Sequence, residues 1–322
     1  MERTGTLEPF VTPLVRLDNL FDAPDLNVYA KLDSLQLSGS TKERTAASLL
    51  DGFIDSGQLV PGGLVIESTS GNLGIALSRQ CVVRGMKFIA VVDENANKSA
   101  LQIMRAYGAE VDIVLDPADG NKLAARRQRV QELLTQFPGA VTTNQYGSPQ
   151  NPAAHYSSTM PEIMRDLDGN LDFLFVATST TGTLLGCQNY VREHQLSTQL
   201  VAVDAEGSVL FDGLPAPRRL PGLGAGVVPE LSLAAKPDHV VRITEMDMVL
   251  GCRRLAHREG ILAGASTGAI VAAMTQMLPD IPTDARIAFL VHDSGVPYLH
   301  TVYDEDWVTE NLGEASHYWT AQ

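Results

Sequence analysis

Short apolar runs bounded by turn residues recur along the chain, and each predicts a buried strand. The clearest runs are Val28–Leu32, Leu64–Glu67, Phe88–Val92, Val111–Leu115, Asp172–Ala177, Leu200–Asp204 and Ile287–Val291. Between them lie helical stretches, of which the best defined are Ile75–Arg84, Lys98–Tyr107, Lys122–Gln136 and Asp247–Glu259. Strands that alternate with helices of this length need crossover connections, so the pattern predicts an α/β fold with parallel sheets covered on both faces.

A chain of 322 residues favours two lobes rather than one. Parallel sheets of this type bind ligands at the carboxyl ends of their strands. Three strand-to-helix loops are therefore the places to look for chemistry, namely Ser68–Gly74, Thr178–Thr183 and Ala263–Gly268.

The net charge of -14 argues against a nucleic acid or an anionic membrane surface as partner, although a pocket can still carry local positive charge. The cysteines Cys81, Cys187 and Cys252 lie far apart, which indicates a reducing compartment without disulfides or a zinc site. We see no signal peptide and no run of membrane-spanning length. We therefore expect a soluble, cytoplasmic protein with no metal.

One lysine stands out in the stretch S-G-S-T-K-E-R-T, which covers Ser38–Thr45. The helix after it should begin near Ser40 or Thr41, because serine and threonine cap helices well. Lys42 would then sit beside the positive end of the helix dipole, which favours the neutral, nucleophilic amine that a Schiff base needs. A solvated surface lysine is the alternative interpretation of this stretch alone.

Each of the three loops joins hydroxyl groups to a helix N-terminus. T-S-T-T-G-T suits a small phosphate, since it lacks the glycine and lysine pattern of a nucleotide loop. Thr69 and Ser70 suit a carboxylate, while the Asn72 amide can donate to a phenolate-like oxygen. Ser266 can pair with a heteroaromatic nitrogen as a neutral partner. Helix capping is the alternative for each loop taken alone, but it does not account for three such loops and a lysine together.

These motifs resemble the cysteine synthase and cystathionine β-synthase family of pyridoxal 5'-phosphate enzymes, from about Pro13 to Trp307. The resemblance implies fold type II, which has two parallel-sheet α/β lobes with the cofactor between them. It also implies a smaller substrate-binding lobe at residues 43–150, a larger cofactor-binding lobe at 1–42 and 151–322, and a homodimer.

The resemblance also assigns roles. Lys42 matches the lysine that binds the cofactor covalently and takes the Cα proton. The substrate carboxylate falls to Thr69, Ser70, Asn72 and Gln145, and Asn72 also reaches the cofactor. The phosphate cradle corresponds to Ser179, Thr180, Thr181, Gly182 and Thr183, and Ser266 takes the pyridine nitrogen. A serine there keeps the ring neutral, which favours β-elimination to an aminoacrylate and then β-replacement.

Departures from sulfide-using members suggest a larger nucleophile. Ser179 and Thr181 replace two glycines, Tyr146 replaces a phenylalanine, and Leu73 replaces a threonine. With these changes the chain resembles the branch of the family that makes 2,3-diaminopropionate precursors for siderophores and peptide antibiotics. Three further stretches share this resemblance, namely V-D-A-E-G-S-V-L-F, R-R-L-P-G-L-G-A and L-G-C-R-R-L. That branch implies O-phospho-L-serine as acceptor, L-glutamate as nucleophile and phosphate as leaving group.

Two anionic substrates need cationic partners. Arg126 lies where the branch carries an arginine and could hold the departing phosphate, although a solvated helix face is an equal alternative. Arg218 and Arg219 are weaker candidates for the glutamate carboxylates, and we expect a structural role for His155. A cysteine synthase that uses sulfide with acetylserine or phosphoserine, and a binding protein without turnover, remain the alternatives.

Overall fold

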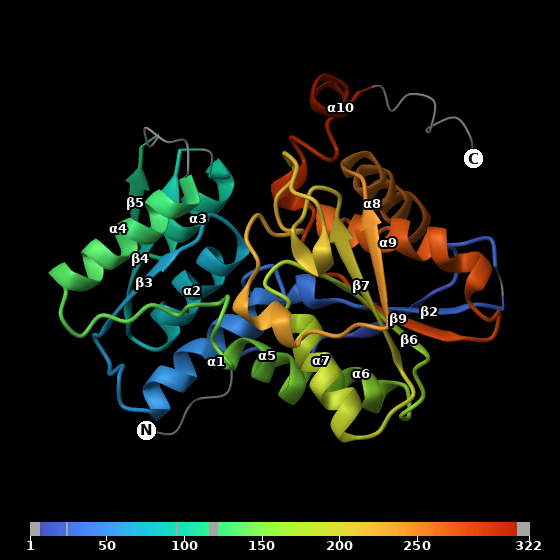
Figure 1. Cartoon of the computed structure of the whole chain (residues 1–322), viewed down its shortest axis with the longest axis horizontal. Coiled ribbons are helices and arrows are strands. Elements are labelled where there is room, and N and C mark those ends of the chain that lie inside the picture. Colours follow the sequence, from blue (N-terminus) through green and yellow to red (C-terminus); the bar gives the residue numbers. More distant parts are fainter. Residues whose placement is uncertain (1–6, 24, 95, 116–121, 314–322) are drawn as a thin grey trace. The chain divides into compact units, whose positions relative to one another are not determined.

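The computed structural model describes residues 7–23, 25–94, 96–115 and 122–313. The chain forms two compact units, each discontinuous in sequence (Figure 1). Unit 1 comprises the described part of Met1–Phe10 together with Gln36–Asn151, and unit 2 comprises Val11–Leu35 and the described part of Pro152–Gln322. Each unit has its own sheet and its own core, so each is described separately.

Unit 1 is built on a parallel sheet in which the strand order follows the sequence. Its strands are β3 (Leu64–Ser68), β4 (Lys87–Asp93) and β5 (Glu110–Val114). Its helices are α1 (Lys42–Asp55), α2 (Asn72–Val83), α3 (Lys98–Ala106) and α4 (Lys122–Gln136), and α5 (Gln150–Ala154) carries the chain into unit 2. Val141 adds an isolated parallel bridge to Val65, so the sheet gains a short extra partner beside β3.

Alternation along the strands of unit 1 divides its core between the two faces of the sheet. Ile66, Ile89 and Val91 pack with Val130 and Leu133 of α4. The residues that point the other way pack with α1, α2 and α3, and they include Val65, Phe88, Ala90 and Val92. Both faces are covered, as expected of a parallel sheet.

Unit 2 contains a mixed sheet with the order β1-β2-β9-β6-β7-β8. Its strands are β1 (Leu14–Leu17), β2 (Asn27–Lys31), β6 (Phe173–Ala177), β7 (Gln199–Ala205), β8 (His239–Ile243) and β9 (Arg286–Leu290). Its helices are α6 (Met160–Asp166), α7 (Gly182–Glu193), α8 (Glu245–Glu259), α9 (Ala265–Met277) and α10 (Glu305–Leu312), with a π-helical turn at His155–Thr159. Only β1 runs antiparallel to its neighbour among the strands described.

The core of unit 2 also divides by strand alternation. Phe175, Val203 and Phe289 belong to the layer packed with α8 and α9. Val176 and Ala202 point the other way, into the layer packed with α6 and α7. Buried thiols lie in both layers, Cys187 in one and Cys252 in the other.

The α/β fold class and most elements predicted from the sequence are confirmed, and α4 has the predicted bounds. Several details differ. α2 begins at Asn72 rather than Ile75, α5, α6, α10 and β8 were not predicted, and β1 makes the sheet of unit 2 mixed rather than wholly parallel. In the described part of the chain, none of the helices combines the length and the apolar character that crossing a membrane requires.

Candidate functional site

Lys42 is the first residue of α1, as the sequence suggested, and its side chain is half-buried. The expected hydroxyl cap is wrong. Thr41 occupies the N-cap position with helical backbone angles, φ -55° and ψ -20°, and its side chain makes no cap hydrogen bond. A cap needs extended backbone for its oxygen to reach the amides of the first turn, and Thr41 does not have it.

Three hydroxyls in unit 1 are buried without a hydrogen-bond partner among the described residues. They are Ser40 Oγ and Thr41 Oγ1, directly before Lys42, and Ser68 Oγ at the end of β3. Buried polar groups in folded proteins are nearly always paired, so an orphan needs a specific explanation. A ligand rich in polar groups, such as a phosphorylated pyridine carrying an amino acid, would supply the missing partners.

The loop between β3 and α2 holds the predicted carboxylate residues. Thr69 is buried and its N–H donates to Val91 O at 3.1 Å, which ties the loop to the end of β4. Ser70 and Asn72 are half-buried, and Asn72 is the first residue of α2. α2 therefore begins within this loop, and the first-turn amides of a helix are suited to an anion site.

Gln145 lies in the segment that follows the bridge at Val141. Its side chain is buried, and its backbone carbonyl accepts a hydrogen bond of 2.7 Å from Asn151 Nδ2. Tyr146, next in the chain, is half-buried, with the Arg127 guanidinium carbon 5.6 Å from its ring centroid. Cation–π contact at this distance orients the tyrosine ring.

Arg126 is brought to the carboxylate loop. Its Nη1 donates to Ser70 Oγ at 3.5 Å, and its Nε lies 3.3 Å from Asp93 Oδ2 at the end of β4. The side chain is 16% exposed, so the solvated helix face weighed as the alternative does not describe it. A guanidinium beside a serine of an anion loop is suited to bind a second anionic group.

In unit 2 the loop from Thr178 to Thr181 joins β6 to α7. Thr178 is fixed by two hydrogen bonds to Val203 O, from its N–H at 2.9 Å and from its hydroxyl at 3.0 Å. Thr181 is buried in the left-handed region, with φ 63°, at the N-cap of α7. A β-branched residue is strained there, which is typical of a backbone that a functional site constrains. This loop presents helix amides and hydroxyls, which fit a phosphate.

His155 braces this loop and does not face solvent. Its Nε2 lies 3.1 Å from Thr183 Oγ1 and its Nδ1 lies 2.9 Å from Thr159 Oγ1, within the π-helical turn. Close packing of this part of the chain against α7 depends on Gly186, because a Cβ there would overlap Pro152 O and the His155 Cβ. A structural role for His155 remains our assignment, and these contacts support it.

Ser266 is buried in the first turn of α9, where its hydroxyl donates to Asp293 Oδ1 at 3.5 Å. Two positioning residues here were not singled out from the sequence. Asp293 Oδ2 accepts a hydrogen bond of 2.6 Å from Tyr298, and His292 Nε2 accepts one of 3.2 Å from Ala177 N, at the end of β6. Both lie in the stretch H-D-S-G, His292–Gly295, which could have drawn attention to them because it directly follows the predicted strand Ile287–Val291.

Arg218 supports the glycine-rich loop of unit 2, P-G-L-G-A-G at Pro221–Gly226. Arg218 Nη1 donates to Leu223 O at 2.8 Å, and a Cβ on Gly224, whose φ is 74°, would overlap that nitrogen. Asp204, at the end of β7, is buried, and burial raises its pKa to about 6 while Ser208 opposes the rise by hydrogen bonding. Arg218 thus supports the loop, while the Arg219 side chain is exposed.

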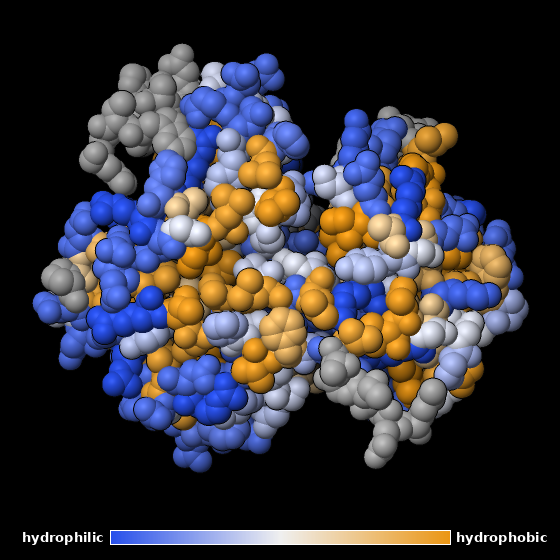
Figure 2. Space-filling view, turned by 180° about the vertical axis from the view of Figure 1, so that it is seen from behind, coloured by the Kyte–Doolittle hydropathy of each residue, from blue (hydrophilic) through white to orange (hydrophobic). Residues whose placement is uncertain are grey.

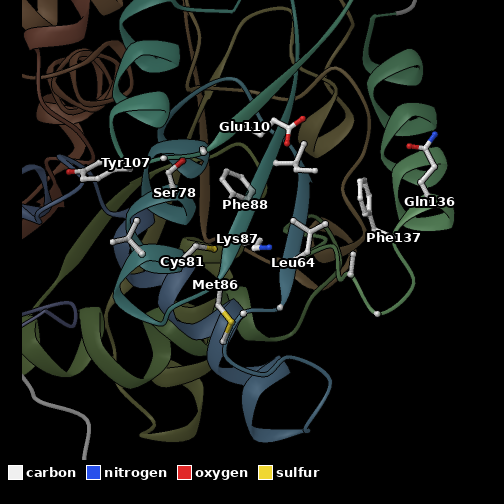
Figure 3. Close-up of a pocket in the computed structure, with 18 of the residues that line it drawn as sticks. Leu64, Ser78, Cys81, Met86, Lys87, Phe88, Tyr107, Glu110, Gln136 and Phe137 are labelled. Atoms are coloured by element: carbon white, nitrogen blue, oxygen red, sulfur yellow. The ribbon is translucent and has the colours of Figure 1, made fainter.

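A cavity of about 680 Å³ in unit 1 lies away from all of these residues (Figure 3). Leu64, Lys87 and Glu110 line it, and these are the first residues of β3, β4 and β5. The cavity is therefore at the amino edge of the sheet, whereas the loop at Ser70 leaves the carboxyl edge. We do not assign it to the candidate site.

A family model described as pyridoxal-phosphate dependent enzyme matches residues 6–293. N-(2-amino-2-carboxyethyl)-L-glutamate synthase of Ralstonia nicotianae is 43% identical over 298 residues, which cover 92% of this chain and 88% of that protein. The solved structure of an O-acetylserine dependent cystathionine β-synthase from Helicobacter pylori matches with a TM-score of 0.83 and 29% identity, over 90% of this chain and 94% of that one. An O-ureido-L-serine synthase structure matches with a TM-score of 0.83 and 30% identity, over 97% and 96%.

These likenesses extend over nearly the whole chain and agree with the orphan hydroxyls, the phosphate-type loop and the position of Lys42. The resemblance inferred from the motifs is thereby confirmed. The chain belongs to the pyridoxal-phosphate-dependent enzymes, with pyridoxal phosphate as its cofactor, and within that family it is an enzyme of β-replacement type.

Proposed function

We propose that the protein transfers the 2-amino-2-carboxyethyl group of O-phospho-L-serine to the amine of L-glutamate, with phosphate as leaving group. The Cβ–O bond to phosphate breaks, a Cβ–N bond to glutamate forms, and the glutamate amine gives up a proton. The products are N-(2-amino-2-carboxyethyl)-L-glutamate and inorganic phosphate. A relative named for this product, 43% identical to the chain, supports the proposal.

The observation that carries the choice of acceptor is the position of Arg126. Its Nη1 donates to Ser70 Oγ at 3.5 Å, so the guanidinium stands beside a loop suited to the substrate carboxylate. The ester of O-acetylserine is neutral in the bound substrate and leaves as a monoanion, whereas phosphoserine already carries a phosphate dianion that a guanidinium binds well. Arg126 would hold the phosphate before and during its departure.

Each remaining residue has a defined part. The cofactor, when bound, supplies an electron sink that makes the Cα proton of the substrate acidic. Lys42 binds it covalently, and the released Nζ takes that proton. The α-carboxylate of the substrate is held by two segments of unit 1, the β3–α2 loop with Thr69, Ser70 and Asn72 and the segment with Gln145.

The second group of proposed residues belongs to unit 2. The phosphate of the cofactor falls to the cradle of Ser179, Thr180, Thr181, Gly182 and Thr183. Ser266 would pair with the pyridine nitrogen as a neutral partner and keep the ring unprotonated. A neutral ring is a weaker electron sink, which favours elimination and replacement. We assign the nucleophile's contacts to Tyr146, whose ring lies near the Arg127 guanidinium.

The test is a product assay with the purified holoenzyme. Incubation with O-phospho-L-serine and ¹⁵N-glutamate should give an adduct that retains ¹⁵N, together with one phosphate per adduct, measured by mass spectrometry and phosphate assay. Parallel reactions replace glutamate with sulfide and phosphoserine with O-acetylserine. Formation of cysteine without any glutamate adduct would contradict the proposal and favour a cysteine synthase.

We further propose a cytoplasmic homodimer whose product is a precursor of 2,3-diaminopropionate for a siderophore or peptide antibiotic. Exposed apolar side chains such as Leu214, Val228 and Leu233 offer surface for a second copy. Apolar groups also gather on the face shown in Figure 2. Light scattering of the holoenzyme measures the oligomeric state directly.

A further inference from the structure

One carboxylate in unit 1 joins the two segments that carry the proposed carboxylate site. Glu67 is the penultimate residue of β3 and is buried, at 6% exposure. Its Oε1 accepts the N–H of Ser68 at 3.0 Å, and its Oε2 accepts the N–H groups of Thr143 and Asn144, each at 3.0 Å. The hydroxyl of Thr143 also donates to Oε2.

The strand geometry explains why an acceptor is needed at this point. Ile66 N donates to Val141 O at 2.8 Å, and Val141 N donates to Leu64 O at 3.0 Å, so residue 141 pairs with β3 as a strand does. Beyond it the ladder ends, and the amides of Thr143 and Asn144 find their acceptor in the Glu67 side chain. Asn144 then turns the chain through the left-handed region, with φ 45°, directly into Gln145.

Burial is the largest influence on the Glu67 carboxyl and leaves its pKa raised, while hydrogen bonds from Thr143, Ser68 and Asn144 oppose the rise. Several donors converging on one carboxylate are the usual way in which a buried negative charge is stabilised. An apolar or amide side chain of the same size could not accept all of them.

We propose that Glu67 is a positioning residue that fixes the substrate-carboxylate site by fastening the Thr142–Gln145 segment to the start of the Ser68–Asn72 loop. The inference rests on the proposed function of that loop and of Gln145. Glu67 itself does not touch the substrate. It sets the spacing between Gln145 and Ser70, which approach the substrate carboxylate from two different segments.

This role predicts a specific kinetic signature. The α-carboxylate is bound alike before and during the reaction, so loosening its site weakens binding without a matching change in the chemical step. Glu67→Gln should therefore raise KM for the amino-acid acceptor roughly tenfold to a hundredfold while kcat changes by less than about threefold. Loss of Lys42, in contrast, removes the chemistry.

The experiment uses the full-length holoenzyme with Glu67→Gln and, as matched control, Glu110→Gln, an exposed glutamate of β5 in the same unit. A double variant of Glu67→Gln with Gln145→Ala tests the route of the effect. If Glu67 acts through Gln145, the double variant has the KM of Gln145→Ala alone. Multiplied KM effects, or a fall in kcat at unchanged KM, would overturn the inference.

A second variant covers the case in which Glu67→Gln does not fold. Thr143→Val removes one hydroxyl donor and leaves both backbone amides in place, so a smaller rise in KM is expected in the same direction. Amide hydrogen exchange of the peptide containing residues 142–146 should also quicken in either variant relative to Glu110→Gln. Unchanged exchange and unchanged KM in Thr143→Val would refute the role.

The test separates this inference from the proposed function. Acceptor KM is measured for both O-phospho-L-serine and O-acetylserine, because both carry the α-carboxylate. A KM effect with acetylserine in a protein that does not use phosphoserine would keep Glu67 in its role and reject the proposed substrate. Normal KM for both acceptors in Glu67→Gln would reject the role whatever the natural substrate is.

Discussion

Arg126 Nε lies 3.3 Å from Asp93 Oδ2, so the guanidinium proposed to bind substrate phosphate is paired with a carboxylate of β4. The pair holds the guanidinium beside Ser70, to whose Oγ the Arg126 Nη1 donates at 3.5 Å. In this position the guanidinium can bind a phosphate dianion through two N–H groups. Pairing also reduces the cost of keeping a mostly buried cation in place before substrate arrives. Arg129, on the same helix and also paired with a carboxylate, offers a matched control for Arg126.

Arg126→Ala should lower kcat/KM for O-phospho-L-serine by roughly a hundredfold, because a charge-assisted bidentate interaction is lost. The value for O-acetylserine should fall less, by under about tenfold, because its ester is neutral in the bound substrate and only a monoanion leaves. Steady-state phosphate and acetate release measure the two. Arg129→Ala, on the same helix but paired with Asp112 and Glu132, is the control. Equal losses for both substrates would remove Arg126 from the phosphate site.

Lys42→Ala should abolish turnover and the absorbance near ~410 nm of covalently held cofactor. Lys98→Ala is a close control, because Lys98 also begins a helix, α3, and is exposed. It should retain both colour and activity. An absorbance spectrum and a borohydride reduction followed by peptide mapping measure the result. Labelling at any lysine other than Lys42 would contradict the assignment.

Lys31 and Glu162 form an ion pair inside unit 2, with Nζ 2.6 Å from Oε2 and side-chain exposures of 0% and 9%. Lys31 Nζ also donates to Thr12 O at 2.6 Å. Glu162→Gln should destabilise the protein by about 3–5 kcal/mol, because it leaves a buried ammonium without its counter-charge. The double change Lys31→Met with Glu162→Leu should recover most of this loss. Thermal unfolding of the variants checks both, and an additive double variant would contradict the pairing.

Asp204 gives the protein a pH-dependent stability with a defined sign. Its pKa is raised from 3.8 to about 6, mainly by burial, so between these values the folded protein holds a proton that the unfolded chain releases. Stability therefore falls as pH rises from about 4 to 6, by roughly 3 kcal/mol for this group alone. Asp204→Asn should lose this component, so its stability relative to the wild type should rise across the same window. Parallel stability curves from pH 4 to 7 would contradict the assignment.

The sequence predicted those features that follow from local pattern. α4 was placed correctly at Lys122–Gln136, and the buried strands β4, β6 and β9 were found within a residue or two, because continuous apolar runs bounded by turns are a strong signal. β8 escaped because His239–Ile243 is an edge strand that is largely exposed, so its pattern is weakly apolar.

Features set by tertiary contacts were beyond local pattern. Thr181 adopts a left-handed backbone conformation, which from sequence alone is expected only of glycine or asparagine. Thr41 was expected to cap α1, yet its helical backbone turns the hydroxyl away from that task. Glu67 did carry a signal, since a carboxylate ending a buried strand must find several donors. Its partners at Thr143 and Asn144, however, lie far along the chain.

The pairing of β2 with β9 has a consequence for synthesis of the protein. Asn27 lies opposite Arg286, so an early strand has its neighbour near the other end of the chain. At about 5–20 residues per second, a ribosome needs roughly 10–50 s to travel between them. Every residue of unit 1 has been made by Asn151. A nascent chain can thus complete unit 1 while β2 has only β1 to pair with and still lacks β9, so Val11–Leu35 is the part of unit 2 that waits longest for a neighbouring strand.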